Sequence, residues 1–245
     1  MTIKSIRKAK NLKGKKIFLR VDFNLPLRNG KVEEDFKIVA SLPTIRFLLS
    51  QKSKIIIASH LGRPVNSPKS KVQSRKIFSL EPVAKRLGQL LGREVKFIND
   101  CVGEKVKSEI EKMKEGEIIV LENLRFYQEE EKNDANFAKK LAGLADIYVN
   151  DAFAVCHRTN ASTVAIKKYL PSCAGLLLEN EIKNLAKIIK PKKPLVAIIG
   201  GAKIETKISL LNKFKKIADY IIIGGALANN FLKANGYKVG KSLIS

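Results

Sequence analysis

The sequence predicts an α/β protein built on a doubly wound, Rossmann-like parallel sheet, and two observations support this class. Short runs of β-branched and aliphatic residues alternate with segments whose apolar residues recur at helical spacing. The runs are apolar almost throughout, which is typical of parallel strands covered on both faces. We therefore expect a complete N-terminal domain followed by a truncated second α/β domain.

Seven runs are predicted as strands, about five of them in the first domain and two in the second. In chain order they are Lys16–Val21, Lys54–Ala58, Glu94–Ile98, Glu117–Leu121, Asp146–Val149, Leu195–Ile199 and Tyr220–Ile223. Each run is short and bounded by polar residues or turn signals, as buried strands are.

The segments between these runs have helical patterns. In the segment 35–50, one face carries the apolar residues Ile38, Leu42, Ile45 and Leu49. Ser79 is predicted as the N-cap of the next helix, and either Asn133 or Asp134 as the cap of a helix that ends at Leu144.

Domain organisation follows from a change of composition after residue 189. A long amphipathic stretch, 174–189, leads into the basic, proline-containing sequence KPKKP at 190–194. We expect a domain over 1–173, an interdomain helix over 174–190 and a partial domain over 191–245. Two parallel strands do not make a self-sufficient sheet, so the second domain reads as incomplete.

Composition excludes several classes of protein. The formal charge is +24, but the lysines are scattered and no aromatic-rich basic stretch is present, so neither a specific nucleic-acid partner nor a membrane is expected. Three cysteines without a CxxC pair fit a reducing cytoplasm, and neither histidine has the partners of a metal site. No apolar run approaches the ~18 residues of a membrane span. We expect a cytoplasmic monomer.

Polar and charged residues gather where the predicted strands of the first domain end. Ligands of open α/β sheets bind beyond the carboxyl ends of the strands. The residues found there are Asp22, Asn24, His60, Arg63, Arg125 and Arg158. Arginine forks bind phosphate or carboxylate through two hydrogen bonds, which lysine cannot do. Each residue alone could be a cap or a solvated side chain, but together they indicate an anion site.

A second cluster follows the strand at Leu195–Ile199. Gly200 and Gly201 allow a close approach of the backbone to a ligand. Lys203 and Lys207 are expected on one face of the first helical turns, where the helix dipole disfavours cations. Their placement is explained if phosphates occupy this helix end, although a solvated lysine face is the alternative.

The strand-end sequences together resemble those of the phosphoglycerate kinases. The matching stretches occur in the order of that family and are RVDFNLPL (20–27), ASHLGRP (58–64), LENLRFY (121–127), YVNDAFAVCHRTNAS (148–162), IIGGAKIETKI (198–208) and IIIGGALANNFLKANGYKVGKSL (221–243). The resemblance extends over almost the whole chain.

The resemblance implies a two-domain hinge enzyme of glycolysis that transfers a phosphoryl group between 1,3-bisphosphoglycerate and ADP, giving 3-phosphoglycerate and ATP, with Mg²⁺. It implies that the first domain binds 3-phosphoglycerate through Asp22, Asn24, Lys37, His60, Arg63, Arg125 and Arg158. The nucleotide and its phosphates would lie along Gly200, Gly201, Lys203, Lys207, Gly224 and Gly225. Lys37 and Lys203 are the residues expected to be catalytic.

Three departures from the family pattern bear on function. An essential arginine of the family falls at Lys37, and a histidine of the basic patch falls at Asn160. The later part of the nucleotide domain, with its Mg²⁺ ligand, is absent, so the chain reads as a fragment with little activity by itself. A non-catalytic phosphoglycerate-binding domain is the alternative, and a nucleic-acid binder ranks last.

Overall fold

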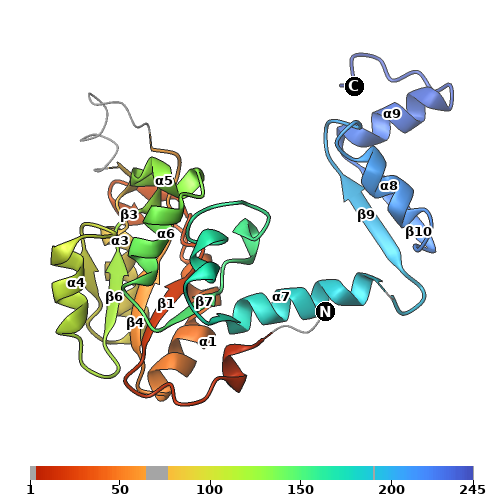
Figure 1. Ribbon diagram of the computed structural model, residues 1–245. Helices are drawn as coiled ribbons and strands as arrows, with labels where there is room; N and C mark the ends of the chain where they lie inside the picture. Colours follow the sequence, from red (N-terminus) through yellow and green to blue (C-terminus); the bar gives the residue numbers. More distant parts are fainter. Residues whose placement is uncertain (1–3, 65–76, 190, 245) are drawn as a thin grey trace. The chain divides into compact units, whose positions relative to one another are not determined.

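The computed structural model describes residues 4–64, 77–189 and 191–244, which form two compact units (Figure 1). The units divide between Ile182 and Lys183. This division falls inside helix α7 (Leu176–Ile189) and within the segment 174–190 that the sequence predicts as the joining helix. Each unit is described by itself below.

The first unit is built on a parallel sheet that has six strands within the described residues, in the order β5-β6-β4-β1-β7-β8. The bounds are β1 (Lys16–Arg20), β4 (Lys54–Ala58), β5 (Lys96–Ile98), β6 (Ile118–Leu121), β7 (Ile147–Asn150) and β8 (Ser172–Ala174). Strand β1 pairs with β4 on one side and β7 on the other, so the chain winds outward in both directions from β1. This confirms the doubly wound sheet.

Helices cover both faces of this sheet, and the alternating side chains of each strand explain why. The helices are α1 (Phe36–Ser50), α3 (Glu81–Leu91), α4 (Glu104–Glu111), α5 (Gln128–Glu131) and α6 (Ala135–Ala142). Ile17 and Leu19 of β1 belong to the apolar cluster of α1 and α3. Phe18, between them, belongs to the cluster of α4 and α6 on the opposite face.

Most predicted helix features are confirmed. The Asp134 carboxylate caps α6 by accepting a hydrogen bond from the Phe137 amide at 2.7 Å. In α1 the buried face includes Ile38, Leu42 and Ile45, as expected. Leu49 is only half-buried, and Leu48 is fully buried instead.

The predicted N-cap at Ser79 is wrong by one residue. Helix α3 begins at Glu81, and its N-cap is Leu80. The Ser79 hydroxyl accepts a hydrogen bond from the Glu81 amide at 3.2 Å and donates one to the Glu122 carboxylate at 2.9 Å. Glu122 also accepts from the Leu80 amide at 2.9 Å, so a carboxylate distant in sequence supplies part of the cap.

Three short strands of the first unit, β2 (Leu27–Arg28), β3 (Lys31–Val32) and β8, were not predicted from sequence. Strand β8 has three residues, too few for a periodic pattern. A hairpin joins β2 and β3 through Asn29 and Gly30, both with positive φ. An Asn-Gly pair with this backbone is the preferred two-residue hairpin turn.

The second unit pairs β9 (Val196–Gly200) with β10 (Tyr220–Gly224) in parallel, and it holds α8 (Ile208–Phe214) and α9 (Ala226–Ala234). Burial alternates along β9. Ala197 and Ile199 are buried, whereas Ile198 between them is 76% exposed. Within the described part of the chain, this unit has a two-stranded sheet with one apolar face exposed.

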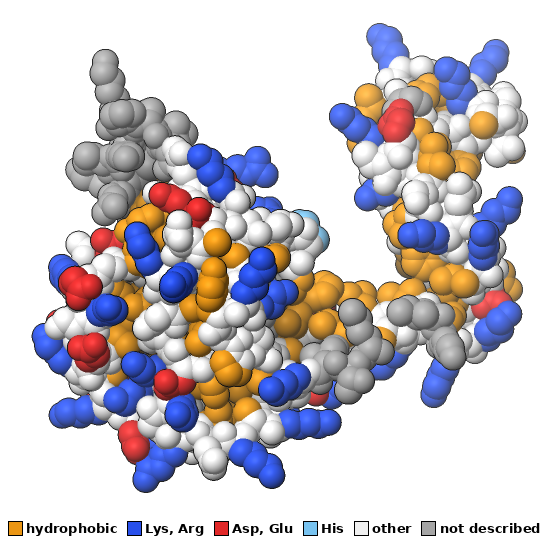
Figure 2. Space-filling view, in the orientation of Figure 1, with side chains coloured by type: hydrophobic (Ala, Val, Ile, Leu, Met, Phe, Trp, Pro, Cys, Tyr) orange, Lys and Arg blue, Asp and Glu red, His pale blue; other side chains and the backbone are white. Residues whose placement is uncertain are grey.

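Lysine and arginine side chains are spread over the visible surface of each unit rather than gathered in one patch (Figure 2). This distribution agrees with solvated lysines in a lysine-rich chain. None of the described helices is both long and apolar enough to span a membrane.

Candidate functional site

The first unit brings the predicted anion-binding residues to one edge of its sheet. They follow β1, β4, β6 and β7 at the carboxyl ends of these strands, and Lys37 joins them from the first turn of α1. We call this set the strand-end site: Asp22, Asn24, Lys37, His60, Arg63, Arg125 and Arg158.

The side chain of Lys37 is held by the loop that follows β1. Its Nζ atom donates to Asp22 Oδ2 at 3.0 Å and to the carbonyl oxygen of Asn24 at 2.7 Å. The Asp22 carboxylate also accepts from the Asn24 amide at 3.1 Å. These three residues therefore form one connected group, with the ammonium fixed at the start of α1.

The loop after β4 is fixed to its neighbours through Gly62. The Gly62 amide donates to Asn24 Oδ1 at 2.8 Å, and its carbonyl accepts from Arg125 Nη1 at 2.6 Å. Gly62 has a φ of +58°, and a Cβ atom here would lie 2.3 Å from the ring of Phe78. Glycine is therefore required both by backbone conformation and by space.

Asn123 holds the loop after β4 through side-chain hydrogen bonds, and it was not predicted as a site residue. Its Oδ1 atom accepts from the Leu61 amide at 3.2 Å and from the Arg125 amide at 3.0 Å. Its Nδ2 atom donates to the Leu61 carbonyl at 2.7 Å. An asparagine two residues after an apolar strand was the sequence signal for this role.

His60 is buried, and its imidazole is neutral. Burial lowers its pKa from 6.5 to about 2, and the positive charges of Arg20, Arg125, Arg158 and Lys37 contribute in that order. The ring contacts Arg20, with 3.2 Å between Arg20 Nη2 and His60 Nδ1. Arg20 was also missed, although an arginine inside an otherwise apolar strand was a visible signal.

Three arginines surround an open hollow of about 190 Å³. Arg63, Arg125 and Arg158 line it, together with Pro64 and Glu131. Arg125 is nearly buried, and its Nε atom pairs with the Glu131 carboxylate at 3.1 Å. Burial and the nearby arginines lower the pKa of Arg125, while Glu131 raises it. One exposed carboxylate against three guanidinium groups leaves a net positive hollow that attracts anions.

Asn160 lies near these residues but has a structural role in its loop. It is buried, its amide donates to the Thr163 hydroxyl at 3.2 Å, and its carbonyl accepts from the Val164 amide at 2.8 Å. The side-chain hydroxyl of Thr163 in turn donates to the carbonyl of Arg158 at 3.0 Å. Asn160 thus helps to hold the loop that carries Arg158.

In the second unit, glycines end both strands. Gly200 and Gly224 are paired in register, and Gly201 and Gly225 follow them. Gly225 has a φ of +64°, and a Cβ atom there would lie 3.3 Å from the Gly201 carbonyl oxygen. That oxygen accepts from the Leu227 amide at 2.7 Å, so the two loops are in direct contact.

The expected helical position of Lys203 and Lys207 is wrong. Helix α8 begins at Ile208, Lys207 is its N-cap, and Lys203 lies in the turn before it. The Thr206 hydroxyl donates to the Lys203 carbonyl at 3.0 Å and helps to form that turn. The segment 203–207 is therefore a loop between the glycine pair and α8, and both lysines remain beside the glycine loops in sequence.

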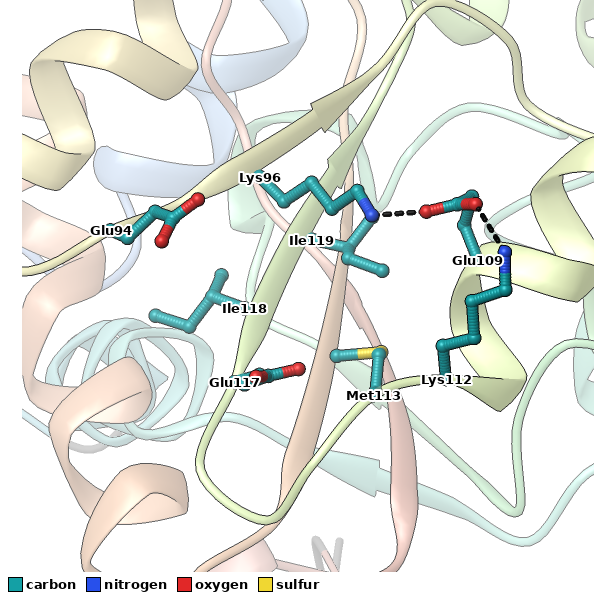
Figure 3. Close-up of a pocket in the computed structure, with 8 residues that line it drawn as sticks. All are labelled: Glu94, Lys96, Glu109, Lys112, Met113, Glu117, Ile118 and Ile119. Carbon is teal, nitrogen blue, oxygen red and sulfur yellow. Dashed lines mark hydrogen bonds and ion pairs between the residues drawn. The ribbon is translucent and has the colours of Figure 1, made fainter.

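A second hollow lies at the opposite, amino ends of β5 and β6 (Figure 3). It measures about 260 Å³, and the Glu109 carboxylate pairs there with Lys96 and, at 3.0 Å, with Lys112. These two ion pairs lower the pKa of Glu109 to about 2. The lysines are thus already paired, and this hollow lacks the net positive charge of the strand-end site.

A metal site built from protein alone needs several carboxylate, imidazole or thiolate ligands in one place, whereas Mg²⁺ in phosphoryl-transfer sites is usually held by one or two carboxylates with water and substrate phosphates. Among the residues that the structure describes, no three such side chains come together.

A doubly wound α/β unit with a cationic site beyond its strand ends is typical of proteins that bind small anionic ligands. The comparisons give the family. The phosphoglycerate kinase family model matches residues 6–245, so the chain belongs to the phosphoglycerate kinase family.

Relatives and solved structures agree with this family. The chain is 53% identical to the phosphoglycerate kinase of Geobacter sp. (strain M21) and 49% identical to that of Dictyoglomus turgidum. These matches cover 100% and 96% of the chain, and 60% and 58% of the relatives. A phosphoglycerate kinase structure from Coxiella burnetii matches the whole chain and 60% of its own, with a TM-score of 0.84 and 40% identity. One from Pyrococcus horikoshii OT3 matches 97% of the chain and 59% of its own, with a TM-score of 0.85 and 34% identity.

The chain thus spans about 60% of the length of the relatives that it matches.

Proposed function

We propose that this chain provides the 3-phosphoglycerate site and the first part of the nucleotide site of a phosphoglycerate kinase. The proposal depends on one observation, the hollow lined by Arg63, Arg125 and Arg158 beside a neutral, buried His60. Family membership supplies the substrate class. The three arginines explain how such a substrate would be bound, because guanidinium forks bind both its phosphate and its carboxylate.

The residues of the strand-end site divide into two groups by chemistry. The three arginines provide charge and paired donors for a phosphate, while His60 offers a ring donor without charge. Lys37, held by Asp22 and Asn24, adds a single ammonium at the start of α1. Lys37 keeps the charge of the family's arginine without its planar fork, so we expect charge stabilisation with weaker orientation of the substrate.

The proposed reaction is a phosphoryl transfer. A carboxylate oxygen of 3-phosphoglycerate forms a bond to the γ-phosphorus of ATP while the bond from that phosphorus to the bridging oxygen of ADP breaks. Such transfer needs alignment and neutralisation of negative charge more than covalent help. In the second unit, Lys203, Lys207 and the glycines Gly200, Gly201, Gly224 and Gly225 are proposed to hold the nucleotide phosphates. Bound Mg²⁺ would neutralise part of the phosphate charge.

Titration calorimetry with 3-phosphoglycerate tests this proposal on the chain as it is. We expect binding that weakens as salt is added, because the contacts are ionic. Replacing Arg125 by Met is expected to weaken the affinity at least about tenfold, the usual effect of losing a charged hydrogen-bond pair. Lys112→Met, in the hollow of Figure 3, is the matched control and is expected to leave the affinity unchanged.

Absence of binding, or equal loss in the Arg125 and Lys112 variants, would contradict the assignment of the strand-end site. A coupled assay of ATP formation tests catalysis separately. We expect little or no turnover from residues 1–245, and turnover at the rate of the full-length relatives would show that this chain needs nothing further.

A further inference from the structure

Arg20, which the functional assignment does not include, is buried between the strand-end site and an internal carboxylate. It is the last residue of β1 and is 2% exposed. Its Nε atom donates to the Ser162 hydroxyl at 2.9 Å, and its Nη1 atom donates to the Val21 carbonyl. Its third contact is Nη2 with Nδ1 of His60, at 3.2 Å.

The direction of these hydrogen bonds is fixed by a carboxylate at the far end. Ser162 donates its hydroxyl hydrogen to Glu130 Oε1 at 2.5 Å, and its amide donates to Glu130 Oε2 at 2.9 Å. Glu130 is 1% exposed. The Ser162 oxygen is therefore left to accept from Arg20, and the guanidinium is held in one orientation.

A guanidinium has donors and no acceptor. The contact between Arg20 and His60 can only be a hydrogen bond if Nδ1 of His60 carries no hydrogen and accepts. A neutral imidazole with a bare Nδ1 carries its hydrogen on Nε2. The contact with Arg20 thus selects one of the two tautomers of His60.

We propose that Arg20 is a positioning residue that fixes His60 in the Nε2–H tautomer, so that the strand-end site presents an uncharged ring donor to the anionic substrate. The inference rests on the proposed function only for the nature of that substrate. The tautomer itself follows from the contact of Arg20 with His60.

The surroundings of His60 favour the same state. The charged groups that act on it are Arg20, Arg125, Arg158 and Lys37, all cationic. A protonated His60 ring would place a fifth positive charge among these four cations. It would also lose the hydrogen bond that Nδ1 accepts from Arg20. The site therefore keeps the same donor and the same charge between pH 8 and pH 5.5.

Nitrogen-15 NMR of the full chain tests the tautomer directly. Correlations between ring hydrogens and ring nitrogens distinguish Nδ1 from Nε2 and show which is protonated. The chain has two histidines, and the other, His157, is exposed and serves as an internal reference. We expect His60 as Nε2–H, unchanged from pH 8 to 5.5. A hydrogen on Nδ1, or protonation of the ring in this range, would overturn the proposal.

Two variants distinguish an effect of Arg20 on the His60 tautomer from an effect on the stability of the fold. Arg20→Met removes the donor to Nδ1 and is expected to give a tautomer mixture or a titrating His60 ring. Ser162→Ala removes the Nε partner of Arg20 but leaves the contact with His60. Both variants are expected to melt at lower temperature, but only Arg20→Met changes the ring signals. A changed tautomer in Ser162→Ala alone would contradict the assignment, and the wild-type spectrum remains decisive if Arg20→Met does not fold.

Calorimetry with 3-phosphoglycerate provides the functional readout. We expect Arg20→Met to bind about tenfold more weakly and Ser162→Ala within about twofold of wild type. If the wild-type chain does not bind 3-phosphoglycerate, the proposed function fails while the NMR result still decides the tautomer. If it binds and Arg20→Met binds equally well, the positioning role is wrong.

Discussion

At the scale of single residues, the strand-end site separates positive charge from neutral hydrogen-bond donation. The arginines and Lys37 carry the charge, and the imidazole of His60 remains neutral because it is buried among them. Near neutral pH the ring is mostly neutral in the unfolded chain as well, so folding releases few protons, but in acid the buried neutral ring makes folding sensitive to pH.

This sensitivity gives a prediction for His60. In the unfolded chain its pKa is near 6.5, whereas in the folded chain it is about 2. Below pH 6.5 the unfolded state therefore binds more protons, and the free energy of unfolding is expected to fall by about 1.4 kcal/mol per pH unit from this group. His60→Gln should remove this slope between pH 6.5 and 5. Urea unfolding at several pH values measures it.

His157→Gln is the matched control for this measurement, because His157 is exposed. We expect it to keep the slope of the wild-type chain. If His60→Gln keeps that slope as well, His60 is not the buried neutral group that the structure shows.

Lys37 gives a second prediction at this scale. Its Nζ atom joins Asp22 and the Asn24 carbonyl, yet 40% of its side chain is exposed. Lys37→Met is therefore expected to change the free energy of unfolding by less than about 1 kcal/mol. We expect the same variant to weaken 3-phosphoglycerate binding about tenfold, and Lys37→Arg to stay within about threefold of wild type. Calorimetry checks both, and equal affinity of Lys37→Met and wild type would remove Lys37 from the site.

At the scale of elements, the start of α7 depends on Asp151, which follows β7. The Asp151 Oδ1 atom accepts from the amides of Leu177 at 2.9 Å and Leu178 at 3.2 Å. Burial raises the pKa of this carboxyl, and the amide hydrogen bonds oppose that shift. A Cβ atom on Gly175 would lie 2.2 Å from Asp151 Oδ1, so the residue before α7 must be glycine.

Gly175→Ala is expected to displace this cap and to destabilise the first unit by about 1–3 kcal/mol, as overpacking usually does. Gly143→Ala is the control, since a Cβ atom there meets its neighbours at an ordinary 3.5 Å. Urea unfolding followed by circular dichroism measures both. Equal midpoints would mean that the loop before α7 moves aside at no cost.

Strands with long apolar runs were predictable, and short or distantly supported elements were not. β1 and β4 are found where they were predicted, because consecutive aliphatic residues indicate a buried strand. β8 was missed because its three residues are too few to show a strand pattern. Ser79 was misplaced as a cap because the decisive partner, Glu122, is distant in sequence.

The candidate site shows the same limit. Arg63, Arg125 and Arg158 were predictable because parallel strands end at one edge of a sheet. Arg20 and Asn123 were missed because their roles depend on partners from other strands and loops. Sequence pattern identifies which side chains reach the edge, whereas the orientation of each depends on contacts that only the fold creates.

At the scale of the whole molecule, the two units differ in how completely they bury apolar side chains. The sheet of the first unit is packed on both faces by helices. In the second unit, one face of the two-stranded sheet exposes large apolar residues, namely Val196, Ile198, Tyr220 and Ile222, at 47%, 76%, 66% and 52%. Contiguous exposed apolar surface of this kind promotes association.

The exposed sheet face and the net charge of +24 act in opposite directions on association. Charge repulsion keeps copies of the chain apart at low salt, and added salt screens it while the apolar face remains. We therefore expect self-association to increase with salt, and Ile198→Lys to reduce it. Light scattering and sedimentation at several salt concentrations measure this.

Substitutions at the neighbouring positions 198 and 199 of β9 are expected to change different properties, association at Ile198 and stability at Ile199. Ile198 is exposed, so Ile198→Lys is expected to change the free energy of unfolding by less than about 0.5 kcal/mol. Ile199, the next residue, is buried, and Ile199→Thr is expected to cost at least about 1 kcal/mol because it replaces a buried ethyl group by a hydroxyl. If both variants destabilise the second unit equally, Ile198 is covered in solution. If association is unchanged in Ile198→Lys and falls with added salt, it is driven by charge and not by this face.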